Sequence, residues 1–179
     1  RVLAQIQKQY DWPGRITASV GKNQKARVLE VASILGGAML VGGAMQSTDK
    51  EVLKNVKRSN ISLEELGSRG SNDQEDMDSY TELILALPGD SIETHTKSLK
   101  DMVATGVGTI KIYQMVMLPQ SEMVEPENRK KYGMHTRFRL TPRSFGKYSL
   151  WGKTFLGMEC EEVCVENNTL SFEDYLECR

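Results

Sequence analysis

Apolar positions along the first two thirds of the chain switch between the period of a strand and the period of a helix. Residues 15–20 alternate polar and apolar side chains, as a half-buried strand does. Residues 38–46 form a continuous apolar run, which is typical of a strand buried on both faces of a parallel sheet. Apolar segments at 80–87 and 109–117, each followed by a proline, complete a set of four predicted strands.

Segments with helical spacing separate the predicted strands. Gly36-Gly37 ends one of them, and Ser47 or Thr48 can cap the next. The predicted helices cover residues 1–10, 22–35, the stretch from Ser47 or Thr48 to Arg58, 63–66, and the stretch from Asp90 or Ser91 to Gly106, with a polar loop at 67–78. This alternation predicts right-handed βαβ units and an α/β fold with a parallel sheet.

The pattern changes after the fourth predicted strand. Residues 120–131 are charged and contain proline, which indicates a linker. The following aromatic and apolar residues stand in short pieces separated by turns, and residues 171–178 have the pattern of a capped helix. The sequence therefore predicts two parts, a larger one at 1–125 and a small C-terminal extension at 126–179.

Composition and charge exclude several functional classes. The chain is 39% hydrophobic and 26% charged with a net charge of −1, so no broad attraction to nucleic acid or to a membrane surface is expected. No apolar run approaches the roughly 20 residues of a membrane-spanning helix, and no signal peptide is visible. We expect a cytoplasmic protein with neither partner, and the initial Arg1 leads us to expect a piece of a longer protein.

The three cysteines, Cys160, Cys164 and Cys178, all lie near the C-terminus. An odd and sparse set argues against a disulfide framework and favours a reducing compartment. Cys160 and Cys164 have no third ligand at a usual metal-site spacing. We expect all three thiols to pack as small apolar groups and to bind no metal.

Three segments carry a resemblance to a known family. Residues 41–54 read Val-Gly-Gly-Ala-Met-Gln-Ser-Thr-Asp-Lys-Glu-Val-Leu-Lys, residues 80–90 read Tyr-Thr-Glu-Leu-Ile-Leu-Ala-Leu-Pro-Gly-Asp, and residues 107–119 form an apolar segment that ends in proline. In this order and spacing they resemble the fourth, fifth and sixth barrel strands of the radical S-adenosylmethionine (SAM) superfamily. The branch that often carries an upstream cobalamin-binding domain is the most similar. The resemblance covers roughly residues 10–125.

The sequence departs from the family pattern at several positions. Ala86 stands where glycine is usual and Asp90 where glutamate is usual. The loop after the sixth strand reads Leu-Pro-Gln-Ser-Glu over residues 118–122 in place of the usual Pro-Gly-Thr. The family's CxxxCxxC loop is expected upstream of Arg1. Cys160 and Cys164 imitate its first half, but Asn167 stands where the third cysteine would be.

The resemblance implies a fold and a set of cofactors. It predicts a partial TIM-type (β/α) barrel of parallel strands, with the rest of the barrel supplied by a missing N-terminal part. The full-length enzyme would bind SAM at a [4Fe-4S] cluster, whose cysteine ligands this chain lacks, and cobalamin is a further candidate cofactor. The chain alone is then expected to be inactive.

In such barrels the chemistry lies at the C-terminal ends of the strands. Gln46 and Ser47 stand at one such end, beyond a face of mostly small residues that would leave room for a ligand. The Gln46 amide can donate to or accept from a ribose hydroxyl. The purely structural explanation is that both residues only cap the next helix.

Glu82 and Gln114 complete the candidate cofactor-binding set. Glu82 is predicted to face inward, opposite three leucines, and to share one cavity with Gln46. An inward carboxylate must be paired. Its partner is SAM, a substrate or a cation, or else a structural residue such as Arg15 or Lys111. Gln114 lies near the end of the last strand with its direction left open. His95 has no nucleophile or metal partner nearby in the sequence, so we expect it to be solvated.

Three functions follow from these observations. The first is part of a radical SAM oxidoreductase or transferase, in which this chain supplies contacts to SAM ribose and adenine and to the substrate. The second is a structural or binding module without catalysis. The third is an unrelated TIM-type enzyme that binds phosphate at a strand end formed by Gly42-Gly43. The substrate is not specified by the sequence.

Overall fold

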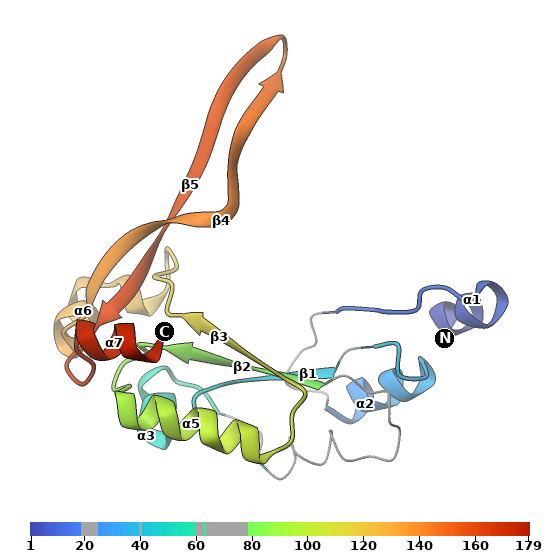
Figure 1. The fold of residues 1–179 in the computed structure, drawn as a ribbon, viewed down its shortest axis with the longest axis horizontal. Coiled ribbons are helices and arrows are strands. Elements are labelled where there is room, and N and C mark those ends of the chain that lie inside the picture. The colour runs from blue at the N-terminus through green and yellow to red at the C-terminus, as the bar shows by residue number, and fades with distance from the viewer. Residues whose placement is uncertain (19–24, 40, 60–62, 64–78) are drawn as a thin grey trace. The chain divides into compact units, whose positions relative to one another are not determined.

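The computed structural model describes residues 1–18, 25–39, 41–59, 63 and 79–179 (Figure 1). The chain divides into two compact units. The first unit is Arg1–Thr48, Ser59–Leu83 and Lys97–Ile112, and the second is Asp49–Arg58, Ile84–Thr96 and Tyr113–Arg179. The predicted helix at 63–66 and loop at 67–78 lie almost wholly outside the described residues, as do the ends of the segments at 15–20 and 22–35.

A parallel sheet confirms the predicted α/β fold class. Strands β1 (Val41–Gln46), β2 (Ser79–Leu85) and β3 (Thr109–Gln114) lie in this order, with β2 in the middle. β1 and β2 run parallel in the register Gly42↔Tyr80 and Ala44↔Glu82. The first predicted strand appears as a single parallel bridge between Ile16 and Met39. Closure of these strands into part of a barrel stays a prediction.

The helices of the first unit follow the predicted apolar spacing. α1 (Val2–Tyr10) matches the predicted helix at 1–10, and α2 (Lys25–Ile34) ends just before Gly36 and Gly37, which both have positive φ. α5 (Ile92–Ala104) places Met102 and Leu99 against Leu83 of β2 and Met45 of β1. The leucine face of β2 is therefore covered by a helix here, as the alternation of buried and half-buried residues along the strand predicted.

The cap of α3 (Lys50–Asn55) is a correction. Asp49 Oδ1 accepts hydrogen bonds from the backbone N–H groups of Glu51 and Val52, at 2.9 and 3.0 Å. The predicted caps, Ser47 and Thr48, are instead engaged with α5. An aspartate one residue further on satisfies the free N–H groups equally well and also complements the helix dipole.

The predicted linker at 120–131 is wrong, because it contains two helices of the second unit. A 3-10 turn, η1 (Glu122–Val124), leads into α6 (Pro126–Tyr132), with Pro126 in the first turn and Gly133 in the left-handed C-terminal position. A β-carbon on Gly133 would meet the Asn168 side chain at 2.0 Å, so this close approach requires glycine. The charged composition reflects the exposed surface of a short helix rather than a linker.

An ion pair fixes α6 against the C-terminal part of the chain. The Arg129 guanidinium donates to both carboxylate oxygens of Glu162, at 2.6 and 2.8 Å, and Thr136 Oγ1 donates to the same carboxylate. The hydrogen bonds from Arg129, followed by the one from Thr136, lower the pKa of Glu162 to about 2, although partial burial opposes this shift.

The aromatic and apolar residues of the C-terminal extension form one long hairpin (Figure 1), rather than the predicted short pieces separated by turns. β4 (His135–Leu150) and β5 (Lys153–Glu166) pair antiparallel with an irregularity between Leu140 and Phe145. This irregularity and the apolar residues on both faces hide the period of two in the sequence. The predicted final helix is confirmed as α7 (Phe172–Cys178), which begins with a capping box between Ser171 and Asp174.

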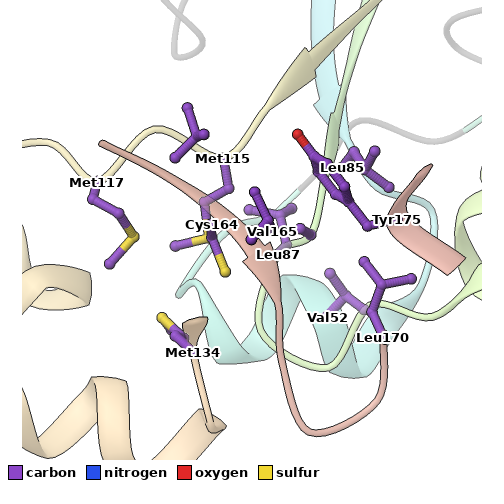
Figure 2. Close-up of a cluster of buried hydrophobic side chains, with 12 residues drawn as sticks. Val52, Leu85, Leu87, Met115, Met117, Met134, Cys164, Val165, Leu170 and Tyr175 are labelled. Atoms are coloured by element: carbon purple, nitrogen blue, oxygen red, sulfur yellow. The ribbon is translucent and has the colours of Figure 1, made fainter. Parts of the chain in front are cut away.

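The core of the second unit joins residues far apart in the sequence, as Figure 2 shows. Its buried members come from α3, β2 and the loop after it, residues 115–117, Met134, β5, residue 170 and α7. The backbone of residues 115–117 leaves the parallel sheet to pair with β5, through Met117 N–H to Glu162 C=O and Cys164 N–H to Met115 C=O. Residues before and after 125 share this core, and the predicted boundary stays a prediction.

Candidate functional site

The end of β1 has an unusual backbone. Gln46 has a φ of 65°, and the Ser47 N–H donates back to the Met45 carbonyl at 2.8 Å. A hydrogen bond between residues two apart around a positive φ is a γ-turn of the rare, strained kind. Strain of this kind is concentrated at ligand-binding positions, so the strand end chosen from the sequence has a local feature that favours a site.

Ser47 and Thr48 connect this strand end to α5 within the first unit. The Ser98 hydroxyl accepts from the Thr48 N–H at 3.0 Å and lies 3.4 Å from the buried Ser47 hydroxyl. Thr48 Oγ1 donates to Asp101 Oδ2 at 2.6 Å, and Lys97 Nζ donates to the same oxygen. Hydrogen bonds from Lys97 and then Thr48 lower the pKa of Asp101. Ser47 is thus held in place structurally, and its predicted contact to a cofactor stays a prediction.

Glu82 lies half-buried on β2, opposite the buried face that carries Leu83. Neither of the structural partners predicted for it is in place within the described residues. Lys111 Nζ lies instead over the Tyr80 ring, 4.4 Å from its centroid, and no hydrogen bond or ion pair joins Glu82 to any described residue. A half-buried carboxylate with no protein partner is the group that a polar ligand would satisfy.

The register brings Glu82 beside β1 but does not place Gln46 on the same face. Ala44 is the direct neighbour of Glu82, so the small-residue face of β1 and Glu82 lie together as predicted. An irregularity between Ala44 and Gln46 then sets Gln46 level with Leu83, whose side chain points into the core. A strict period of two cannot be continued through such a bulge. That Gln46 and Glu82 share one cavity stays a prediction.

Gln114, the last residue of β3, belongs to the second unit. Its Oε1 accepts a hydrogen bond from Arg139 of β4, and Arg139 is also paired with Glu161 at 2.6 Å. Local patterns in the sequence did not indicate this contact, because Gln114 and Arg139 lie on different sides of the predicted linker. Gln114 has a structural partner, and its role toward a cofactor stays a prediction.

The loop after β2 is held by a buried carboxylate. Ala86 has a φ of 68°, which explains why the resembling family has glycine at this position. Asp90 Oδ2 accepts from the Ala86 N–H at 3.1 Å, while Oδ1 accepts from Thr94 Oγ1. Ser91, not Asp90, caps α5, since its hydroxyl accepts from the Thr94 N–H. Of the two predicted caps, the structure therefore selects Ser91.

The expectation that His95 is solvated is wrong. His95 is 3% exposed, and its Nδ1 lies 3.4 Å from Asp90 Oδ2. The sequence showed no partner near His95, but in the second unit this turn of α5 brings it against Asp90. Asparagine and threonine side chains reach the same loop, with Asn167 Nδ2 donating to the Leu87 carbonyl and Thr169 Oγ1 to the Asp90 carbonyl.

Two known proteins are similar to this chain along most of its length. No protein-family model matches the chain. A 2-(S-pantetheinyl)-carbapenam-3-carboxylate methyltransferase from Streptantibioticus cattleyicolor is 29% identical over 185 residues, which cover 99% of this chain and 26% of that protein. The cobalamin-dependent radical SAM methyltransferase TokK from Streptomyces tokunonensis is 29% identical over 141 residues, 75% of this chain and 20% of TokK.

The chain is similar to two methyltransferases, one of which is named as a cobalamin-dependent radical SAM enzyme. The resemblance drawn from residues 41–54, 80–90 and 107–119 is thereby confirmed, including the branch with cobalamin-dependent members. The chain spans about a quarter of the length of the curated relatives it matches.

The expected cofactors are a [4Fe-4S] cluster and SAM, and the described residues bear on both. No group of three or more His, Cys, Asp or Glu side chains in the described part of the chain is arranged to hold a metal ion. A [4Fe-4S] cluster therefore does not fit these residues. At the β1–β2 strand ends, the Glu82 carboxylate and the Gln46 amide make no hydrogen bond to described residues.

The cysteines lie in different surroundings. Cys160 is exposed, Cys178 is half-buried, and Cys164 is buried with its thiol donating to the Glu166 carbonyl at 3.3 Å. Burial raises the pKa of Cys164 to about 11, which keeps it protonated and unreactive at neutral pH. No helix in the described part of the chain is long and apolar enough to cross a membrane.

Proposed function

We propose that this chain forms the C-terminal wall of the catalytic barrel of a radical SAM methyltransferase, with SAM contacted at the carboxyl ends of β1 and β2. The observation that carries the proposal is the match to a methyltransferase along 99% of the chain, which the shorter match to a named radical SAM methyltransferase supports. Methyl transfer is the activity that both relatives' names share. We therefore propose a transferase rather than an oxidoreductase.

In this proposal, the residues of the chain bind and orient SAM but do not hold the cluster. The Glu82 carboxylate accepts hydrogen bonds from ribose hydroxyls or from the ammonium group of the methionine part. The Gln46 amide, presented by the γ-turn, can both donate to and accept from the ribose. Bound SAM supplies the methyl group, and the cluster ligands belong to a part of the protein outside these residues. Cobalamin, on which TokK depends, is proposed as a second cofactor.

No observation favours the other two functions. The proposed phosphate site at a strand end is wrong in its geometry, because Gly42-Gly43 lies inside β1 and the Gly43 carbonyl accepts from Thr81 Oγ1 at 2.7 Å. A purely structural module gives no role to Glu82, whose half-buried carboxylate has no partner among the described residues.

The test uses the longest natural polypeptide that contains this chain, reconstituted with iron and sulfide without oxygen. We expect reductant-dependent cleavage of SAM to 5′-deoxyadenosine and transfer of a deuterium-labelled methyl group from SAM. A cluster-loaded polypeptide that binds no SAM and cleaves none would contradict the proposal and favour the module. The same assay without reductant is the control for chemical decay of SAM.

A further inference from the structure

The β4–β5 hairpin extends away from the end where its two strands begin and finish (Figure 1). Its distal half, residues 141–158, exposes apolar side chains on both faces and at its turn. The exposed apolar residues of this distal hairpin are Phe145, Tyr148, Leu150, Trp151, Phe155, Leu156 and Met158. Leu156 is 82% and Met158 70% exposed. A two-stranded ribbon is marginally stable alone in water, and exposed apolar patches mark interaction surfaces.

The register separates the two faces of the distal hairpin. On one face Tyr148 pairs with Phe155, and their rings stack with centroids 5.8 Å apart. The Tyr148 ring also lies over Gly157, where a β-carbon would meet it at 3.0 Å. On the opposite face Phe145 pairs with Met158 and Lys147 with Leu156. This second face, the docking face, has no comparable ring stack between its own side chains.

The turn of the hairpin holds a tryptophan in a costly conformation. Leu150 pairs with Lys153, so Trp151 and Gly152 form a two-residue loop, and both have positive φ, at 49° and 72°. Asparagine followed by glycine is the preferred pair for such a turn. A left-handed backbone costs a residue other than glycine roughly 1–2 kcal/mol. A 91% exposed tryptophan in that position gains nothing within the hairpin.

The charged residues of the distal hairpin are all positive. Residues 141–158 contain Arg143, Lys147 and Lys153 but no aspartate or glutamate, a charge of +3. The other 161 residues then contain 20 basic and 24 acidic residues (23 − 3 and 24 − 0), a charge of −4. A surface that covers the docking face would complement these cations with carboxylates.

We propose that the distal hairpin is a docking arm that packs onto an acidic, partly apolar surface of the same polypeptide, in a part that lies outside these 179 residues. The proposal rests on the proposed function, because that function requires a further part that holds the cluster. The matched relatives have room for it, since the 185 aligned residues are 26% of one of them. A further part of that length is large enough to cover both the apolar docking face and Trp151.

The experiment applies a carbodiimide, which joins lysine amines to carboxylates in direct contact, to the full-length, cluster-loaded protein. An equal mixture of ¹⁴N- and ¹⁵N-labelled protein distinguishes links within one chain from links between two. We expect links from Lys147 or Lys153 to carboxylates outside these 179 residues, within one chain. Replacing both lysines by arginine removes the links. The double variant L156E/M158E reduces them at least about fivefold, whereas V103E, at a comparably exposed valine on α5, leaves them unchanged.

Each other outcome contradicts the docking arm. Links only between labelled and unlabelled chains identify a second copy as the occupant. Co-sedimentation of the protein with phosphatidylserine vesicles, lost in W151E, identifies a membrane. The absence of links, with amide exchange at residues 141–158 as fast as in an unfolded peptide, shows a free arm. SAM cleavage in the same preparation separates the two proposals: cleavage without links contradicts only the docking arm, and links without cleavage contradict only the proposed function.

Discussion

Ala86 is the residue at which the difference from the related family can be tested most simply. Its φ of 68° costs an alanine roughly 1–2 kcal/mol, while glycine loses about 0.5–1 kcal/mol of backbone entropy. We predict that Ala86→Gly leaves the free energy of unfolding unchanged or raises it by up to about 1 kcal/mol. Ala86→Val should lower it by more than about 2 kcal/mol, because valine is strained in this backbone and the site is fully buried.

Thermal unfolding of the variants measures the effect. Lys100→Gly, at an exposed position inside helix α5, is the control and should be destabilising by about 0.5–1 kcal/mol. A clear loss of stability in Ala86→Gly, equal to that of the control, would show that the backbone at Ala86 is not left-handed.

A second residue-scale prediction concerns Glu162 and pH. Since Arg129 and Thr136 hold the pKa of this carboxyl at about 2, below its ordinary 4.5, ionisation stabilises the folded state. The stabilisation is complete above about pH 4.5 and is lost as the pH falls through about 2. At pH 7, Glu162→Gln should lower the free energy of unfolding by about 1–2 kcal/mol.

The difference in melting temperature between wild type and Glu162→Gln should shrink steadily between pH 4.5 and pH 2. Glu122→Gln removes an exposed ion pair with Lys57 and should change stability by less than about 0.5 kcal/mol at any pH. A Glu162 effect that persists unchanged at pH 2 would mean that packing, and not the ion pair, is responsible.

Individual contacts were the part of the site that the sequence could not supply. Glu82 was correctly expected opposite the leucine face, because the period of two continues unbroken through residues 81–85. His95 was misjudged: it is buried beside Asp90, in a loop to which the distant residues Asn167 and Thr169 also bond. Local periodicity carries no information about such partners.

At the scale of elements, the hairpin turn gives a prediction that links stability to docking. Trp151→Asn fits the left-handed backbone better than tryptophan and should leave unfolding unchanged or raise its free energy by up to about 1 kcal/mol. Gly152→Ala should lower it by about 1 kcal/mol, because its φ of 72° disfavours a β-carbon although the space around it is open.

Hydrogen exchange of the amides in β4 and β5 measures both effects locally. If Trp151→Asn makes the hairpin less stable in the absence of docking, the tryptophan has a role within the hairpin, and the argument from its cost fails.

The elements themselves were predictable where one period dominated. The parallel strands and α1, α2, α5 and α7 follow from apolar runs, helical spacing and end signals such as Gly36-Gly37 and Ser171. The hairpin and α6 were missed for opposite reasons. Apolar residues on both faces of the hairpin obscure a period of two, and the charged surface of α6 leaves no apolar stripe to mark it as a helix.

For the whole molecule, the central question is which surface faces SAM. The sequence predicted where the strands end, and the register shows that Ala44 and Glu82 are neighbours. The sequence did not predict the bulge before Gln46. A single inserted residue reverses the face of the side chains that come after it. The account therefore depends on Glu82 more than on Gln46.

The most direct measurement is the affinity of the full-length, cluster-loaded protein for SAM in the Glu82→Gln and Gln46→Ala variants. Loss of a charged hydrogen bond should weaken SAM binding about tenfold in Glu82→Gln, equivalent to about 1.4 kcal/mol, and several-fold in Gln46→Ala. Thr81→Ser, on the buried side of the same strand, is the control and should bind SAM as the wild type does. Unchanged SAM affinity and unchanged SAM cleavage in both variants, with the fold intact, would contradict the assignment of these strand ends to the SAM site.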